Sequence, residues 1–131
     1  LQLSLPTLDP ARLLAVGARL GVLRHLGVLV IGSGFLTHGL PYLRDWSPSA
    51  NPPGWSVDFD LWATDAVLRG DLDTLADFRH SAPGMPYAHP TTEHLAPLFV
   101  ALGSASRIGA PAQEMIDGYF YGLAKRSFEV A

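Results

Sequence analysis

The sequence predicts an α/β fold, with a mixed, largely parallel sheet and flanking helices. Three observations favour this class. Residues 1–5 (LQLSL) alternate between apolar and polar side chains, and residues 28–31 (VLVI) form the continuous apolar run of a strand buried on both faces. Residues 10–25, between them, carry apolar side chains at helical spacing. Strand, helix and strand with short connections form a βαβ unit, which favours parallel pairing and a right-handed crossover.

The domain is expected to be incomplete. The chain has 131 residues, which is enough for one hydrophobic core. However, it starts at Leu1, directly inside the first expected strand, with no residues leading into that strand. We therefore expect residues 1–131 to form one part of a single larger domain.

The expected helices have recognisable boundaries. For the helix over 10–25, Asp9 can cap the N-terminus, Pro10 suits the first helical position, and Gly27 suits the end. Three further helices each follow a residue that can cap a helix. They are expected at 57–69 after Ser56, from Asp71 to about Arg79, and at 92–102 after Thr91.

Loops and a hairpin account for the rest of the chain. Residues 114–121 and 125–130 are predicted to be two strands that form a hairpin around Gly122. The proline-containing segments 45–55 and 80–90 are predicted to be loops. These loops hold three aromatic residues that either anchor them, the reading we favour, or line an aromatic pocket: Trp46, Trp55 and Tyr87.

Composition excludes several classes of protein. The formal net charge is −3 and no run of Lys and Arg occurs, so we expect no nucleic-acid partner. No apolar run approaches the ~18 residues of a membrane span, and no signal peptide is visible, so we expect no membrane partner and a cytoplasmic location. The chain has no cysteine, which leaves His and carboxylate side chains as the available metal ligands.

The first candidate for chemistry is His38, in the stretch GVLVIGSGFLTHGL (27–40). Ligands of open α/β sheets bind beyond the carboxyl ends of strands, and Gly32-Ser33-Gly34 follows the expected strand 28–31 directly. Glycines there allow the backbone to approach a ligand closely. The stretch lacks the third glycine of a dinucleotide-binding fingerprint, and GSGFL is not the G-x-S-x-G elbow of a serine hydrolase. Two readings stay open for His38: packing with turn geometry, or chemistry.

The second candidate is the stretch HPTTEHLAPL (89–98). His89, Glu93 and His94 place three possible metal donors within six residues, and imidazole and carboxylate suit zinc and non-haem iron. The stretch supplies too few well-spaced ligands for a closed site, so partners would have to come from elsewhere. The alternative is a capped helix with a solvated Glu-His pair. An unrelated metal-dependent hydrolase that uses His38 and the Glu93/His94 pair also stays open.

Taken together, the two stretches resemble the class III extradiol ring-cleavage dioxygenases. With the opening LQLSLP and the closing GYFYGLAKRSFEV, the chain looks like the C-terminal half of members of the 4,5-DOPA dioxygenase-like branch. The resemblance implies one divalent metal, Fe(II) or Zn(II), and the opening of a catechol-type ring with O₂. It implies roles for six residues: His38 in acid–base catalysis or at the metal, His94 or Glu93 at the metal, and Gly34, Thr37 and His89 at the substrate.

One departure from the family pattern matters. Family members are about twice as long, and their first half carries two further histidines, one of them in a His-Gly-x-Pro turn that is missing here. We therefore expect most metal ligands to come from the N-terminal half of the same domain, and the isolated chain to be inactive. The alternative is a non-catalytic partner or binding subunit. An exposed sheet edge would favour a homo-oligomer.

Overall fold

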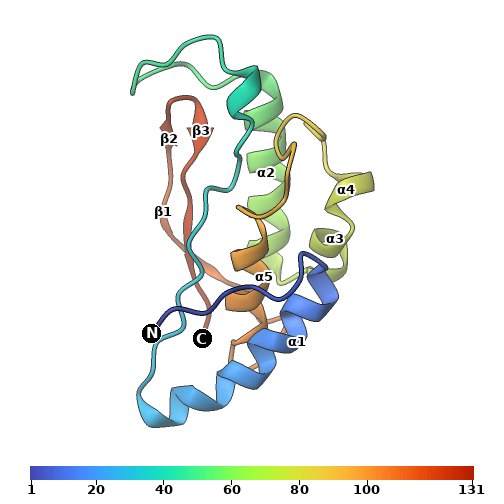
Figure 1. The fold of residues 1–131 in the computed structure, drawn as a ribbon, viewed down its shortest axis with the longest axis vertical. Coiled ribbons are helices and arrows are strands. Elements are labelled where there is room, and N and C mark those ends of the chain that lie inside the picture. Colours follow the sequence, from blue (N-terminus) through green and yellow to red (C-terminus); the bar gives the residue numbers. More distant parts are fainter.

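Helices and one long hairpin build the fold in the computed structural model, which describes residues 1–131 (Figure 1). The α-helices are α1 (Pro10–Gly21), α2 (Gly54–Arg69), α3 (Leu72–Ala76), α4 (Phe78–Ser81) and α5 (Ala96–Gly103). Two short 3₁₀ helices are η1 (Val22–Leu26) and η2 (Leu40–Tyr42). The strands are β1 (Gln113–Ile116), β2 (Tyr119–Phe120), β3 (Leu123–Ala124) and β4 (Ser127–Glu129). No helix is both long and apolar enough to cross a bilayer.

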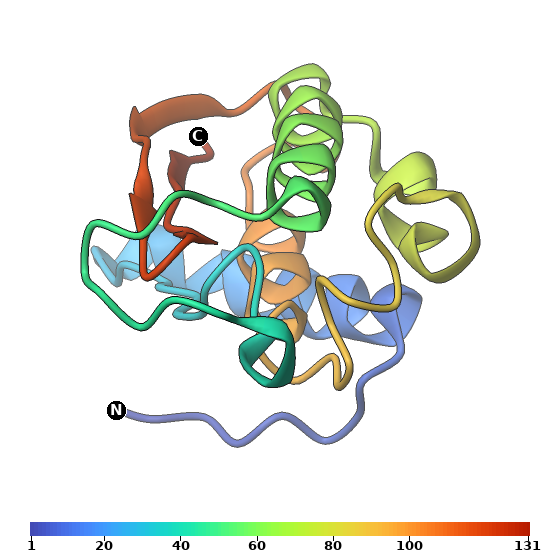
Figure 2. The same cartoon turned by 90° about the horizontal axis from the view of Figure 1, so that it is seen from above.

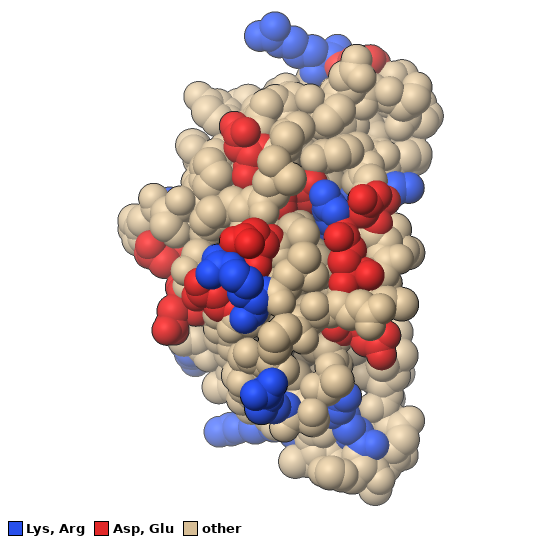
Figure 3. Space-filling model, turned by 180° about the vertical axis from the view of Figure 1, so that it is seen from behind, with Lys and Arg blue, Asp and Glu red and all other residues tan.

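The helices α2 and α5 lie at the centre of the molecule. Figures 1 and 2 show the hairpin on one side of them and α3 and α4 on the other, while α1 crosses α5. The core between these elements consists of fully buried apolar side chains, the largest of which are Leu13, Phe59, Val67, Leu75, Phe78 and Phe99. On the face seen in Figure 3, acidic and basic side chains are interspersed, and no basic patch forms there.

The first helix begins as predicted. The side chain of Asp9 accepts a hydrogen bond from the backbone N–H of Arg12 at 2.8 Å, and Pro10 occupies the first turn. The expected helix 10–25 is in fact α1 followed by η1, and Gly27, with φ of 74°, ends η1.

The predicted largely parallel sheet is not present. Residues 1–5 and 28–31 belong to no strand, and both sheets are small and antiparallel, with β1 paired to β4 and β2 paired to β3. An apolar pattern indicates that a segment suits burial in a sheet, but a strand forms only where a neighbouring strand can pair with it. Here the apolar run is largely uncovered: the exposed fractions are 79% for Leu29 and 76% for Ile31.

The predicted hairpin around Gly122 is confirmed. Phe120 pairs with Leu123 across a two-residue turn, in which Tyr121 and Gly122 have φ of 54° and 74°. Two successive positive φ values are those of a type I′ turn, whose twist matches that of paired strands. A register shift between Glu114 and Ile116 bends the longer pair, β1 and β4.

Two of the three other expected caps are wrong. The side chain of Asp71 does cap α3, 3.1 Å from the N–H of Thr74, although the expected helix is divided into α3 and α4. Ser56 lies inside α2, which starts at Gly54. Thr91 caps nothing, because α5 starts only at Ala96. The reason is that proline fits only the first turn of a helix, so Pro97 sets the start of α5.

Candidate functional site

An extended segment, residues 32–39, brings the two candidate stretches together. It runs between the hairpin and α5 (Figure 1), and its backbone is held on both sides. The N–H of Leu36 donates to the carbonyl of Ala124 at 3.1 Å, and the N–H of His38 donates to the carbonyl of Ala88 at 2.8 Å. As a result, the imidazole of His38 stacks on that of His94, with ring centroids 3.4 Å apart and planes inclined by 19°.

Gly34 makes this approach possible. A Cβ atom at Gly34 would overlap the carbonyl oxygen of His94, so no larger residue fits without moving one of the two backbones. The close approach seen at this glycine is to the chain itself, just before the start of α5, and not to a ligand. Its predicted contact with substrate stays a prediction.

We expect Gly34→Ala to disturb the site. The methyl group has to displace the His94 carbonyl, so the free energy of unfolding should fall by about 1–3 kcal/mol, and the two imidazole rings should separate. Urea unfolding and the NMR signals of the histidine rings measure the two effects. Gly54→Ala is the matched control, because a Cβ there meets no atom within 4 Å. An equal result for the two variants would contradict the prediction.

Burial, hydrogen bonds and nearby charges set the charge states of His38 and Glu93. Burial lowers the pKa of His38 from 6.5, and the nearby His94 lowers it further, against an opposing effect of Glu93. The hydroxyl of Thr91 donates to the carboxylate of Glu93 at 2.6 Å and lowers the pKa of that carboxyl group. Near pH 7, therefore, His38 is a neutral imidazole beside an ionised Glu93. A neutral imidazole can accept a proton from a bound molecule.

His89 is a buried residue behind this pair. Its Nε2–H donates to the carbonyl oxygen of Leu36 at 2.8 Å, and its ring packs edge-on against Phe59. Its Nδ1 has no partner, so the ring is the neutral Nε2–H tautomer. Burial lowers the pKa of His89 to about 4. His89 thus holds the backbone that leads to His38, and its predicted role in substrate binding stays a prediction.

This burial predicts a pH dependence of stability. The unfolded state takes up a proton at His89 near pH 6.5, whereas the folded state resists it until about pH 4. Stability from this residue is complete above pH 6.5 and is lost as the pH falls toward 4, by roughly 3 kcal/mol. Urea unfolding of wild type and His89→Gln at neutral pH and near pH 4.5 tests this. Parallel losses in both proteins would contradict it.

Thr37 is also buried and fully used by the fold. Its hydroxyl oxygen accepts the N–H of Ala124 at 2.8 Å and lies 2.9 Å from the hydroxyl of Ser56. It therefore joins the segment 32–39 to β3 and α2. The predicted contact of Thr37 with substrate is not tested by these bonds.

The donors present do not make a metal centre by themselves. Imidazole and carboxylate are suitable ligands, and the Nε2 of His94 lies 3.9 Å from the carboxylate of Glu93. However, no group of three His, Asp or Glu side chains is placed to hold an ion. The stacked rings of His38 and His94 also direct their lone pairs along nearly parallel planes, so they do not converge on one point.

A cavity of about 650 Å³ lies near His38, because Pro41 and Tyr42, which follow His38 closely in the chain, line it. Trp55 and Tyr87 line it, and the edge of the Trp55 ring packs against Gly39, the residue after His38. The ring of Tyr42 meets that of Tyr87 edge-on at 4.9 Å. Of the two readings for these aromatic residues, Trp55 and Tyr87 fit a pocket, whereas Trp46 is 59% exposed and does not line it.

Sequence reasoning missed a buried ionic cluster. Asp60 on α2 is fully buried and accepts two hydrogen bonds from Arg126, at 2.7 and 2.8 Å, and one from the hydroxyl of Tyr119 at 2.6 Å. Arg126 also pairs with Glu114. Burial, then Asp60, raises the pKa of Tyr119 to about 12. The available signal was an aspartate next to Phe59 on the apolar face of a predicted helix.

Comparison with known proteins decides the family. A family described as the catalytic LigB subunit of aromatic ring-opening dioxygenase matches residues 2–122. The chain belongs to the LigB family. The resemblance to class III extradiol dioxygenases is thereby confirmed, and it rests on almost the whole chain.

Individual relatives agree with this membership. The 4,5-DOPA dioxygenase extradiol of Mirabilis jalapa is 39% identical over 105 residues, which cover 78% of this chain and 38% of that protein. The protein of the same name from Portulaca grandiflora is 39% identical over 100 residues, covering 76% and 36%. An uncharacterized Escherichia coli K12 protein of known structure superposes with a TM-score of 0.77 at 25% identity, covering 94% of this chain and 51% of that one. The chain thus spans under two fifths of the curated relatives' length.

Proposed function

We propose that this LigB chain is the C-terminal part of an extradiol dioxygenase domain that opens a catechol-type ring with O₂. The observation that carries the proposal is the stacked pair of His38 and His94, drawn from the two stretches that resemble the family. The chain's membership of the LigB family and its 39% sequence identity to each of two 4,5-DOPA dioxygenases support the reaction class.

In this proposal His38 is the proton-transfer residue. Its lowered pKa keeps the ring neutral near pH 7, so it can accept a proton from a catechol hydroxyl and return it later. The buried His89 bonds the carbonyl of Leu36, and the buried Thr37 bonds the N–H of Ala124, so both hold the backbone that leads directly into His38. Gly34 allows the backbone of His94 to lie close by, which keeps His94 next to His38.

The metal has to be bound largely by groups outside this chain. We propose Fe(II), with Zn(II) as the alternative, and we place most of its ligands in the N-terminal half of the same domain, because His38, His94 and Glu93 do not form a metal centre. His94 or Glu93 is the ligand that this chain would add. We therefore expect the isolated chain to be inactive.

Oxygen uptake with a catechol tests the proposal. The chain is measured alone and after co-expression with the part of the Mirabilis jalapa relative that lies outside the matched region, each supplied with Fe(II). We expect no uptake by the chain alone, and uptake with a yellow ring-opened product by the complex. Normal turnover by the chain alone would overturn the expected inactivity. An iron-loaded complex that consumes no O₂ would favour a non-catalytic partner subunit.

Other properties stay predictions. No observation here favours the unrelated metal-dependent hydrolase. A cytoplasmic location, the lack of nucleic-acid and membrane partners, and a homo-oligomer rest on the sequence alone. Fractionation of cells that express the natural gene, and light scattering of the purified protein, test the location and the oligomeric state.

A further inference from the structure

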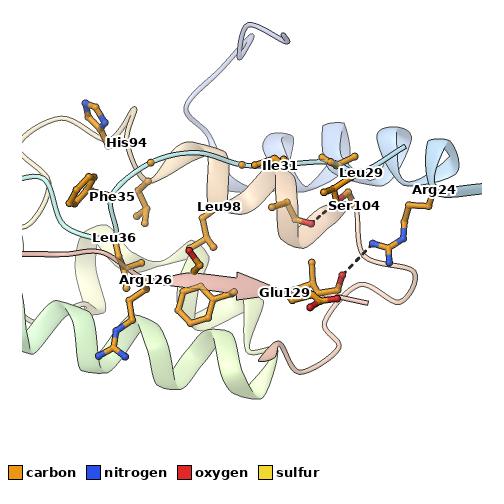
Figure 4. Close-up of a pocket in the computed structure, with 18 of the residues that line it drawn as sticks. Arg24, Leu29, Ile31, Phe35, Leu36, His94, Leu98, Ser104, Arg126 and Glu129 are labelled. Carbon is orange, nitrogen blue, oxygen red and sulfur yellow. Dashed lines mark hydrogen bonds between the residues drawn. The ribbon is translucent and has the colours of Figure 1, made fainter. Parts of the chain in front are cut away.

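A groove of about 730 Å³ lies between two extended segments (Figure 4). One wall is formed by Val28–Gly32 and Gly34–Leu36, and the other by Ser127–Val130. Leu98 and Ala101 on α5 line the groove as well. Arg24 closes one end, where its guanidinium donates to the carbonyl of Val130 at 3.3 Å. His94 lies at the other end (Figure 4).

Both walls have free hydrogen-bonding groups. Residues 29–35 make no hydrogen bond to the rest of the chain, either through backbone or through side-chain atoms. On the other wall, β4 pairs only with β1, so its second edge has no partner strand. Backbone N–H and C=O groups need partners when they are covered, and a strand edge is a template for another strand.

The first wall is also apolar. Leu29 and Ile31 are 79% and 76% exposed, and Val28 is 44% exposed. Large side chains of this kind are usually covered by a neighbour when they occur in a row. A strand laid along the groove would cover them and would satisfy the free groups of both walls at once.

We propose that this groove receives one extended β-strand from the part of the LigB domain that lies outside this chain. The inference deepens the proposed function, since it names the surface on which the missing half docks. A strand of five or six residues, about 17–20 Å long, would be hydrogen-bonded to both walls, with apolar side chains facing Leu98 and Ala101.

The relatives favour this occupant. The Escherichia coli K12 protein contains the fold of this chain in 51% of its length, so about as many residues again lie outside the matched part. In the Mirabilis jalapa relative the matched part is 38% of the protein. A second copy of this chain fits less well, because symmetric pairing of residues 28–35 with themselves would cover one wall and leave β4 unpaired.

The groove also connects docking to the candidate site. Gly34, Phe35 and His94 line the end opposite Arg24. A strand that fills the groove therefore ends beside the stacked imidazoles of His38 and His94. The residues next to that strand in sequence are placed to bring the missing side chains to the pair, since loops at strand ends carry the ligand-binding groups of open α/β sheets.

Hydrogen exchange of the backbone amides tests the docking. In the chain alone, the amides of residues 29–35 should exchange at the rate of an unstructured peptide. After co-expression with the unmatched part of the Mirabilis jalapa relative, they should exchange at least ~100-fold more slowly. The amides of Ser127–Glu129 that face the groove should slow as well.

A charge in the groove provides the variant. Ile31→Lys places an ammonium group between the two walls and should abolish co-purification of the unmatched part. Leu61→Lys, on the exposed side of α2, is the matched control, since Leu61 is 59% exposed and does not line the groove. Because the side chains of Ile31 and Leu61 are both exposed in the chain alone, neither variant should unfold the chain.

Each outcome decides the inference. Slow exchange of residues 29–35 in the chain alone would overturn it. Slow exchange at every protein concentration would mean that the chain closes its own groove. Slow exchange only at high protein concentration would mean that a second copy fills it. Failure of the unmatched part to bind, binding without protection of residues 29–35, or equal binding by the two variants would also overturn it. Protection without O₂ uptake would uphold the docking and contradict the proposed function. Uptake without protection would do the reverse.

Discussion

Replacing the buried carboxylate, as in Asp60→Ala, is expected to lower the free energy of unfolding by about 3–5 kcal/mol. The side chain of Asp60 is fully buried, and the guanidinium of Arg126 is nearly so, with an exposed fraction of 11%. Removing the carboxylate leaves that charge without its bidentate partner and leaves the hydroxyl of Tyr119 without its acceptor. Urea unfolding at neutral pH measures the loss.

Two further proteins make this test specific. Asp65→Ala removes an ion pair with Arg69 whose side chains are 66% and 57% exposed, and should cost no more than about 1 kcal/mol. The double variant Asp60→Leu/Arg126→Met removes both buried charges and should recover much of the stability lost in Asp60→Ala. If Asp60→Ala and Asp65→Ala lost equal stability, the cluster would not hold the hairpin to α2.

His38→Gln is expected to lower kcat about 10²- to 10⁴-fold in the complex that takes up O₂. Glutamine keeps the size and polarity of the side chain but cannot accept and return a proton near pH 7. In the wild type, kcat should rise with pH through the lowered pKa of His38, because only the neutral ring is a base. The variant should lose that part of the pH profile.

The control for this prediction is His80→Gln. His80 lies at the surface, 83% exposed, and its ring contacts Asp77. The variant His80→Gln should leave kcat unchanged. Bound iron, measured for each variant, separates two roles of His38: unchanged iron with low kcat indicates proton transfer, whereas loss of iron indicates a ligand. A kcat for His38→Gln within a few-fold of the wild type would contradict both roles.

The local elements that the sequence predicted correctly depend on neighbouring residues. Asp9 and Asp71 cap their helices through bonds to N–H groups three residues later, and the turn at Gly122 needs only a pair of residues with positive φ. The meeting of His38 and His94 was implied by the family resemblance and is seen in the structure as a stacked pair. The caps and the turn need little information from the rest of the chain, whereas the stacked pair joins two stretches that are far apart in it.

The features that were missed depend on distant residues. The ionic cluster joins Asp60 to Arg126, which is 66 residues later in the chain, and no local pattern encodes that pairing. The start of α5 was placed too early because the capping residue Thr91 was weighed without Pro97. The parallel sheet was predicted from apolar patterns whose partner strands are not formed.

By itself, the sequence determined the family, the starts of α1 and α3, the hairpin and the identity of the candidate donors, because these follow from residue types at short spacing. Only the tertiary structure decided that His89 and Thr37 are buried supports, that Gly34 lies against the backbone of His94, and that Val28–Leu36 forms one wall of an open groove. The physical reason is that burial and hydrogen-bond partners are properties of surfaces that meet in space. Residues far apart in the chain form those surfaces, and local spacing does not specify how they meet.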